Sequence, residues 1–350
     1  MVLPNKMCDE HRSDISKKSV LVWGGLGFLG QPLVSKLLEG GMEVSVLCRS
    51  RKLYPAPVWA SRVRWFELDG ADPGGNSVLF EAVSSASIIY DFAGSSGAAA
   101  SNRQPSLSLD ENCRTQLAFL AACEKAGHCP HVVFPSSWLV YASGQPGPGG
   151  EAGPKDPVDE TCSLGPLSMY AAHRLCIEHY LKIYAARGWI TYTICRISNP
   201  YGFDPAPTAR GYKVLNTFIQ RALAGKPIEI FGDGRQLRDF IYISDVARAL
   251  FHCGLVPEAR NEVMNISSGN SHALVEAVET LIDLIGPSPV MFRPWPDEYR
   301  SVEPGDYRAD ISKARRLLGF HPEYDLKSGL RETIRDYSCD AKPRAVGISV

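Results

Sequence analysis

The stretch Val20-Leu-Val-Trp-Gly24-Gly25-Leu-Gly27-Phe-Leu-Gly30 decides the fold of the first half of this chain. Its first four residues are apolar, as in a strand buried on both faces, and residues 31–39 follow with the periodicity of an amphipathic helix. The glycines between them allow a tight turn. The sequence therefore predicts a strand, a glycine turn and a helix, in that order.

The same alternation of strand and helix patterns continues along the chain. We expect strands at 20–23, 44–47, 63–68, 88–92, 132–134 and 191–197, and helices at 31–39, 113–125 and 170–186. Apolar strands that alternate with helices form parallel sheets covered on both faces. The sequence therefore predicts an α/β fold with a doubly wound parallel sheet of the Rossmann type.

The chain has 350 residues, enough for two domains at roughly 150 residues each. After residue 200 the strict alternation fades, with a helix expected at 214–224 and a strand at 228–231. The expected units are a flexible N-terminal arm (1–18), a Rossmann domain (19–200, to which the chain can return around 240–255), a smaller C-terminal lobe (201–335) and a tail (336–350).

Charge and composition exclude several classes of protein. The 37 Lys and Arg residues against 38 Asp and Glu leave a net charge of -1, which offers no basic field for nucleic acid. The 10 cysteines are scattered without a Cys-x-x-Cys pair, and no signal stretch or apolar run of about 18 residues is present. We expect a cytoplasmic enzyme that binds no nucleic acid, no membrane and no metal.

The glycine turn predicts a dinucleotide site. A turn of this kind lets backbone N–H groups approach a pyrophosphate at the N-terminus of the following helix. The expected cofactor contacts are Gly24, Gly27, Phe28, Leu29 and Gly30. A purely structural turn is the alternative interpretation.

The residues after the second strand bear on the choice of cofactor. Sites for NAD usually carry an acidic residue about twenty positions after the turn, where this chain has Cys48. Arg49 follows in a basic turn, and a cation can pair with a 2′-phosphate, so NADP is the better physical match and NAD the other candidate. A solvated basic turn is the alternative for Arg49. Asp69 and Gly70, after the third strand, are expected near the adenine.

Two segments predict a catalytic centre. Ser137 lies at the carboxyl end of a central strand, where open α/β sheets bind ligands. Tyr170 and Arg174 are spaced i, i+4, which places them on one face of a helix, while His173 is on another face and is expected to be structural. A cation beside a phenol stabilises the phenolate, and a nearby serine can hydrogen-bond the same substrate oxygen. Tyr170 and Arg174 are also candidate cofactor contacts.

Together these segments resemble the extended short-chain dehydrogenase/reductase family, in its NAD(P)-dependent sugar-nucleotide epimerase and dehydratase branch. The resemblance covers about residues 19–335. It implies that the domain at 19–200 mainly binds a dinucleotide and that the lobe at 201–335 mainly binds a sugar nucleotide. Besides the segments above, it rests on Arg196-Ile-Ser-Asn199-Pro-Tyr201-Gly202 and on the run from Ile230 to Asp245.

The resemblance implies a role for each matching residue. Ser137 would hydrogen-bond the reacting oxygen, and Tyr170 would act as acid and base. Asn199 and Arg238 would contact a nucleoside diphosphate, and Phe231 would pack against its base. A structural ion pair of Arg238 with Asp239 or Asp245 is the alternative.

The chain departs from the family pattern at three positions. The family's Tyr-x-x-x-Lys ends in Arg174, the acidic residue after the second strand is Cys48, and a late Arg-Pro-Gly-Asp contact to the diphosphate reads Glu303-Pro-Gly-Asp306. Arg300 is a candidate substitute at the third position.

The residues after Ser137 bear on the reaction. Dehydratases of this branch carry an Asp-Glu pair there, whereas this chain has Trp138 and Leu139, neither of which moves a proton. The sequence favours an epimerase that acts on a nucleotide-diphosphate sugar through a transient 4-keto intermediate. An NADPH-dependent 4-keto-sugar-nucleotide reductase and a catalytically weakened cofactor-binding regulatory protein are the alternatives. The branch often forms homodimers through a four-helix interface, here the helices at 113–125 and 170–186.

Overall fold

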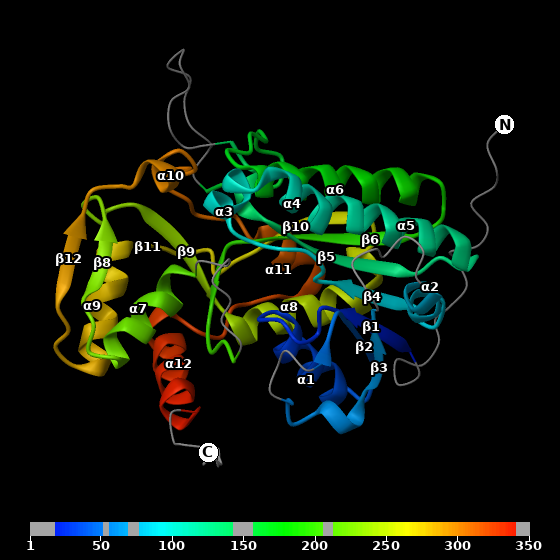
Figure 1. The fold of residues 1–350 in the computed structure, drawn as a ribbon, viewed down its shortest axis with the longest axis horizontal. Coiled ribbons are helices and arrows are strands. Elements are labelled where there is room, and N and C mark those ends of the chain that lie inside the picture. Colours follow the sequence, from blue (N-terminus) through cyan, green and yellow to red (C-terminus); the bar gives the residue numbers. More distant parts are fainter. Residues whose placement is uncertain (1–17, 52–55, 69–76, 143–156, 206–212, 341–350) are drawn as a thin grey trace, which may run out of the picture.

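The computed structural model describes residues 18–51, 56–68, 77–142, 157–205 and 213–340. Within these ranges the chain forms a large part built on a parallel sheet and a smaller lobe beside it (Figure 1). No helix in the same ranges combines the length and the apolar character needed to cross a bilayer.

The large part is a seven-stranded sheet in which all strands are parallel. In spatial order the strands are β10 (Glu262–Ile266), β6 (Thr191–Ile197), β5 (His131–Ser137), β4 (Ile88–Asp91), β1 (Ser19–Trp23), β2 (Glu43–Cys48) and β3 (Arg64–Glu67). The order reverses beside β1, as in doubly wound Rossmann sheets. The predicted fold class is confirmed.

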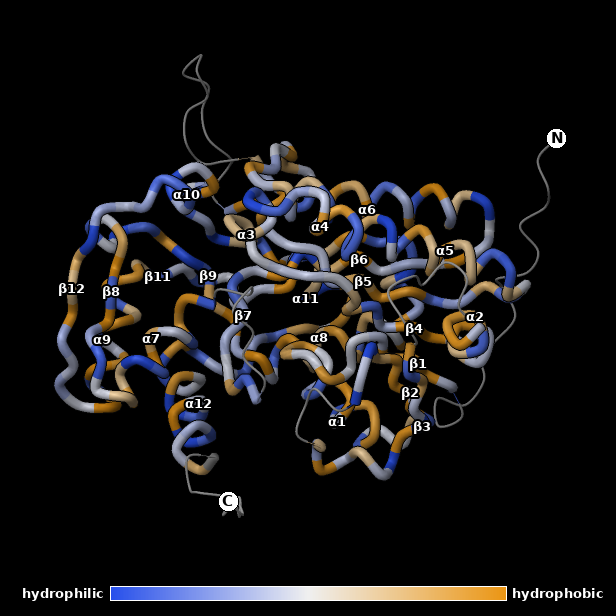
Figure 2. Tube along the Cα trace, in the orientation of Figure 1, coloured by the Kyte–Doolittle hydropathy of each residue, from blue (hydrophilic) through white to orange (hydrophobic). Residues whose placement is uncertain are grey.

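Successive residues of β1 pack on opposite faces of this sheet, because the side chains of a strand alternate between its two faces. Val20 and Val22 belong to the hydrophobic cluster on one face, and Leu21 and Trp23 belong to the cluster on the other. The first face is covered by α1 (Gly30–Glu39) and α8 (Ile243–Leu255), the second by α2 (Ser77–Ser84), α5 (Thr115–Ala126) and α6 (Met169–Ala186). Figure 2 shows hydrophobic residues gathered along these strands.

Several short elements complete the large part. They are α3 (Ala98–Arg103), α4 (Pro105–Leu109), a π-helical turn (Asp110–Arg114) that leads into α5, and 3-10 turns at Ala60–Arg62, Trp138–Val140 and Pro257–Ala259. The predicted helix at 113–125 is therefore a π-helical turn followed by α5.

The smaller lobe holds two small sheets and several helices. The first sheet is β11 (Ser271–Ala273), β9 (Leu237–Tyr242) and β7 (Asn199–Tyr201); the second is β12 (Val290–Arg293) and β8 (Ile228–Phe231). The helices are α7 (Val214–Leu223), α9 (Leu274–Ile285), α10 (Asp297–Arg300) and α12 (Leu326–Asp340), whereas α11 (Ser312–Leu318) packs against β10 of the large sheet.

Two boundaries differ from the sequence-based expectation. The chain returns to the large part over a longer stretch than 240–255, because β10 forms the seventh strand at the edge of the sheet. Asn265 interrupts the apolar run that would have marked this strand, and Glu262 begins the strand with a charge. At the C-terminus, α12 continues to Asp340, past the expected start of a tail at 336.

Candidate active site

A cavity of about 920 Å³ lies where the carboxyl ends of the large-sheet strands meet the smaller lobe. Ligands of open α/β sheets bind in a crevice at this position. The lining includes most of the candidate residues, namely Gly24, Gly27, Phe28, Leu29, Gly30, Arg49, Ser137, Tyr170, Arg174, Asn199, Phe231 and Arg238. The structure thus brings together residues from distant parts of the sequence.

The glycine turn forms one end of the cavity. Gly24 has a φ of +82°, its N–H donates to the carbonyl oxygen of Leu47 at 2.9 Å, and the N–H of Gly27 donates to the carbonyl oxygen of Gly24 at 2.9 Å. A Cβ at Gly30 would lie 2.4 Å from the same carbonyl oxygen of Gly24, so a side chain does not fit there. The glycines therefore place no side chain between the cavity and the N-terminus of α1. A pyrophosphate site requires this, because the phosphate oxygens approach backbone N–H groups.

One arginine of the basic turn after β2 faces the cavity and another does not. Arg49 is exposed and lines it, whereas Arg51 pairs with Glu67 at 3.4 Å. Burial, followed by the charge of Glu67, raises the pKa of the Cys48 thiol to about 11. Of the two arginines in this turn, Arg49 is the one that the structure places on the cavity. Asp69 and Gly70 lie outside the described residues.

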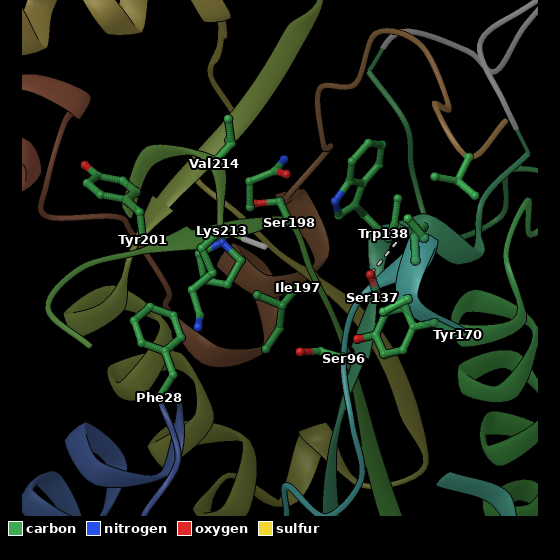
Figure 3. Close-up of a pocket in the computed structure, with 18 of the residues that line it drawn as sticks. Phe28, Ser96, Ser137, Trp138, Tyr170, Ile197, Ser198, Tyr201, Lys213 and Val214 are labelled. Atoms are coloured by element: carbon green, nitrogen blue, oxygen red, sulfur yellow. Dashed lines mark hydrogen bonds between the residues drawn. The ribbon is translucent and has the colours of Figure 1, made fainter. Parts of the chain in front are cut away.

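Ser137 is the last residue of β5 and presents its hydroxyl to the cavity (Figure 3). Its Oγ accepts the N–H of Leu139 at 3.2 Å, which leaves the hydroxyl hydrogen available to a ligand. Ser136 is committed elsewhere, since its hydroxyl donates to the buried Glu178 at 2.5 Å. Ser137 is therefore the serine of this pair that can serve a substrate.

Tyr170 is placed by the start of α6. Ser168 caps the helix, its Oγ accepting the N–H of Ala171 at 3.2 Å, and the N–H of Tyr170 donates to Ser101 at 2.9 Å. Figure 3 shows the hydroxyls of Tyr170 and Ser137 pointing into the same part of the cavity, with the hydroxyl of Ser96 opposite them. Ser96 was not identified from the sequence, because it lies in a loop without a distinctive pattern.

Arg174 is buried one helical turn after Tyr170, with 6% of its surface exposed. Its guanidinium lies 5.1 Å from the centroid of the Tyr170 ring and 5.2 Å from that of Phe134. Its Nε and Nη1 have no hydrogen-bond partner among the described residues. Buried N–H donors are costly when they are unpaired. The orphaned donors on the cavity wall therefore fit a polar group of a bound cofactor, such as a ribose hydroxyl.

Polar residues that the sequence did not single out lie beneath this site. Asp91 is fully buried at the end of β4 and its Oδ1 accepts the N–H of Ala93 at 3.0 Å. Burial raises the pKa of Asp91 to about 6, opposed by the Ala93 hydrogen bond, by Gln116 and by the charge of Arg174. Asn112, in the π-helical turn, donates to the carbonyl oxygen of Ser108 at 2.9 Å. Asp91 and Asn112 are hard to identify from the sequence, because each is a single polar residue outside any recognisable motif.

His173 takes part in a contact outside the cavity. Its Nδ1 lies 3.1 Å from the hydroxyl of Ser108, and it is not among the described residues that line the cavity. Burial, followed by the charge of Arg174, lowers the pKa of the imidazole. These contacts agree with the structural role expected for His173.

The smaller lobe supplies the other end of the cavity. Asn199 donates from Nδ2 to the carbonyl oxygen of Asp239 at 3.2 Å. The ring of Phe231 lies 5.7 Å from that of Trp295 and 5.5 Å from that of Tyr299, between ring centroids. These three rings form an aromatic wall suited to a flat ring. The wall is larger than the single Phe231 that the sequence indicated.

Arg238 is buried at this end and already has partners. It pairs with Glu303 and donates to the carbonyl oxygens of Leu237 and Gly305, both at 2.9 Å. The structure thus contains a structural ion pair of Arg238, as in the alternative interpretation, but the partner is Glu303 and not Asp239 or Asp245. Asp239 accepts N–H groups of Ser268, Gly269 and Ala309, and Asp245 pairs with Arg248.

Arg300 is not brought to the site with the others. It is the exposed last residue of α10, and it is absent from the cavity lining that the described chain forms.

The fold and the cavity together define a protein of the Rossmann type, in which the glycine turn and the smaller lobe line one cavity. The chain belongs to the NAD dependent epimerase/dehydratase family, whose model matches residues 20–267. The family resemblance found in the sequence is confirmed.

Individual relatives carry several activities. The chain is 30% identical over 323 residues to a putative UDP-glucose 4-epimerase from Methanocaldococcus jannaschii, covering 90% of this chain and 97% of that protein. It is 27% identical over 330 residues to the dTDP-4-dehydro-6-deoxyglucose reductase of Escherichia coli, covering 93% and 99%.

Solved structures of epimerases share the fold. The UDP-glucose 4-epimerase of Thermotoga maritima, solved with UDP-glucose, superposes with a TM-score of 0.78 at 26% identity, covering 92% of this chain and 99% of that chain. The UDP-glucose 4-epimerase of Thermus thermophilus, solved with NAD, gives a TM-score of 0.76 at 26% identity, covering 91% and 99%.

Proposed function

We propose that the protein is an NAD(P)-dependent epimerase that acts on a nucleoside diphosphate sugar through a transient 4-keto intermediate. The observation that carries the proposal is the convergence of the Ser137 and Tyr170 hydroxyls beside the guanidinium of Arg174, whose Nε and Nη1 find no partner in the described chain. The similarity to UDP-sugar 4-epimerases supports it. A bound nicotinamide would supply the group that takes hydrogen from the sugar carbon and returns it.

Each of the three residues has a step to perform. Tyr170 accepts the proton of the C4 hydroxyl as the carbonyl forms, and gives it back when the carbonyl is reduced. Ser137 donates its hydroxyl hydrogen to the same oxygen, because its Oγ is already held by the N–H of Leu139. Arg174 holds a positive charge next to the phenol and stabilises the phenolate that carries the reaction.

The wall beside Ser137 argues against dehydration. Trp138 is buried and its ring lies 4.4 Å from that of Tyr307, between centroids. Neither Trp138 nor Leu139 has a group that moves a proton. An elimination across the next carbon of the sugar has no acid or base at these positions.

A 4-keto-sugar-nucleotide reductase is the second candidate. Arg49 lines the cavity and is suited to the 2′-phosphate of NADPH, and the similarity to a reductase supports the same idea. The same Ser137 and Tyr170 would serve it, with the cofactor consumed instead of recycled.

The test is incubation with a panel of UDP-, GDP-, CDP- and dTDP-sugars, followed by NMR and mass spectrometry. Conversion of a sugar to its C4 epimer, without net change of the cofactor, supports the epimerase. Stoichiometric NADPH oxidation with a 4-keto sugar supports the reductase. Cofactor binding without turnover of any sugar contradicts both and favours the weakened regulatory protein.

We also propose that two copies of the chain pair through α5 and α6. Leu117 on α5 is 44% exposed and Ile183 on α6 is 53% exposed, and Leu109 at the end of α4 adds a third apolar side chain. Burying such side chains between two copies is favourable. Light scattering after gel filtration measures the mass, and a monomer at micromolar concentration contradicts this part of the proposal.

A further inference from the structure

Three cations that line the cavity toward the smaller lobe are already paired with carboxylates. Lys213 lies 2.8 Å from Asp204, Arg103 pairs with Glu298, and Arg238 pairs with Glu303. A diphosphate that reaches any of them therefore meets a neutralised cation. A phosphate oxygen that takes the paired N–H donor of one of these cations must displace the carboxylate from it.

The three pairs differ in how firmly they are placed. Arg103 and Glu298 are 55% and 41% exposed, so water already competes for both. Lys213 faces an Asp204 side chain that is only 5% exposed and cannot leave for water. Arg238 and Glu303 are 10% and 21% exposed, with the carboxylate the more exposed partner. In the pair of Arg238 and Glu303, therefore, a buried cation is paired with a carboxylate that can move away into water.

Arg238 is held in place without help from Glu303. Its Nη1 donates to the carbonyl oxygens of Leu237 and Gly305, and its guanidinium lies 5.7 Å from the centroid of the Trp138 ring. Glu303 has fewer interactions than Arg238. Besides Arg238, its carboxylate accepts one hydrogen bond within the described chain, from the N–H of Gly305 at 3.1 Å. Arg238 therefore stays at the cavity wall when the carboxylate moves away.

We propose that Glu303 is a specificity-determining counter-ion, which the diphosphate of the substrate displaces from Arg238. This inference rests on the proposed nucleoside diphosphate substrate. The carboxylate carries one negative charge and occupies the donor that a phosphate oxygen would use. It lowers the affinity of the site for every diphosphate and makes binding depend on contacts of the base and the sugar as well.

The test is calorimetric titration of UDP into the purified protein and its Glu303→Gln variant, each with the cofactor that it retains. We expect the variant to bind UDP at least about 10-fold more tightly, equivalent to about 1.4 kcal/mol. Uridine, which has no phosphate, should bind equally to both proteins. The variant should also lower KM for a converted UDP-sugar more than it changes kcat.

Glu229→Gln is the matched control. Glu229 lines the same cavity, but its partners Arg221 and Arg293 do not belong to the lining that the described residues form. Removing its charge should therefore change UDP affinity by no more than about 3-fold. An equal gain in both variants shows a general charge effect and overturns the role of the Arg238 pair. If Glu303→Gln does not fold, Glu303→Ser replaces it with the same expectation.

The outcomes separate this inference from the proposed function. If the wild-type protein converts UDP-sugars and Glu303→Gln binds UDP no more tightly, the inference is wrong and the function stands. If neither protein binds UDP or any other nucleoside diphosphate, both are wrong.

Discussion

The guanidinium of Arg174 lies over the ring of Tyr170, with its Cζ 5.1 Å from the ring centroid. Both residues belong to the first two turns of α6, and both line the cavity. The ring of Phe134, 5.2 Å from the same guanidinium, limits how far the cation can move away. The relationship fixes a positive charge next to the phenol, as the lysine of the family pattern would.

This relationship predicts the behaviour of two Arg174 variants. Arg174→Lys keeps a positive charge one turn after Tyr170, so turnover should be retained or raised, because a compact ammonium fits a ribose better than a forked guanidinium. Arg174→Ala should lose activity at pH 7 and shift the rate profile to higher pH, since the phenolate loses its nearby cation. Rates measured between about pH 6 and pH 10 test both expectations. Full activity of Arg174→Ala at pH 7 would show that α6 is not catalytic.

Tyr170→Phe should abolish turnover, a loss of more than about 1000-fold, because it removes the hydroxyl that moves the proton. The ring remains, so packing and the contact with Arg174 are retained, and cofactor affinity should stay within a few-fold. Steady-state rates and cofactor titration measure the two quantities. Unchanged activity would remove Tyr170 from the mechanism.

Ser137→Ala should reduce the rate by about 10 to 1000-fold, the range expected when one hydrogen bond to the transition state is lost. The effect is milder than for Tyr170 because the proton path survives. Ser136→Ala is a useful comparison, since its hydroxyl serves Glu178 and its loss should act on stability. A Ser137→Ala enzyme as fast as the wild type would mean that another group holds the substrate oxygen.

Arg49→Ala should weaken NADP(H) more than NAD(H), because only NADP(H) carries the 2′-phosphate. The loss of one charge-assisted contact amounts to about 1.5 to 3 kcal/mol. Fluorescence titration with both cofactors gives the difference. Equal loss of both would place Arg49 away from the ribose.

Asp91→Asn should change how stability depends on pH. The pKa of Asp91 is raised to about 6 in the folded protein, whereas an unfolded Asp titrates near 4. The unfolded chain therefore releases its proton first, and the wild-type protein loses stability as pH rises from about 4 to 6. Asn cannot ionise, so the variant does not lose this stability. As pH rises from about 4 to 6, the free energy of unfolding of the variant should increase relative to that of the wild type by up to about 3 kcal/mol.

Denaturant unfolding of both proteins at several pH values, from about 4 to about 7, checks this expectation. The difference between the two curves isolates Asp91 from the other buried carboxyl groups, whose titration is common to both. Parallel curves would show that Asp91 ionises normally in the folded protein.

The sequence by itself determined the features that depend on local pattern. The glycine turn, the alternation of strands and helices, and the i, i+4 spacing of Tyr170 and Arg174 are set by neighbouring residues, because strand and helix periods place side chains over short distances. The parallel Rossmann sheet follows from these periods. So does the position of Ser137, since a strand end is visible where an apolar run stops.

The tertiary structure alone decided which distant residues meet. Arg238 and Glu303 are 65 positions apart, and their pairing depends on how the segment of Glu303 lies against β9. The same packing left Arg300 away from the cavity, placed β10 at the edge of the large sheet, and left two donors of Arg174 without a partner among the described residues. These features are non-local, set by how the elements fill space together, and no period in the sequence encodes them.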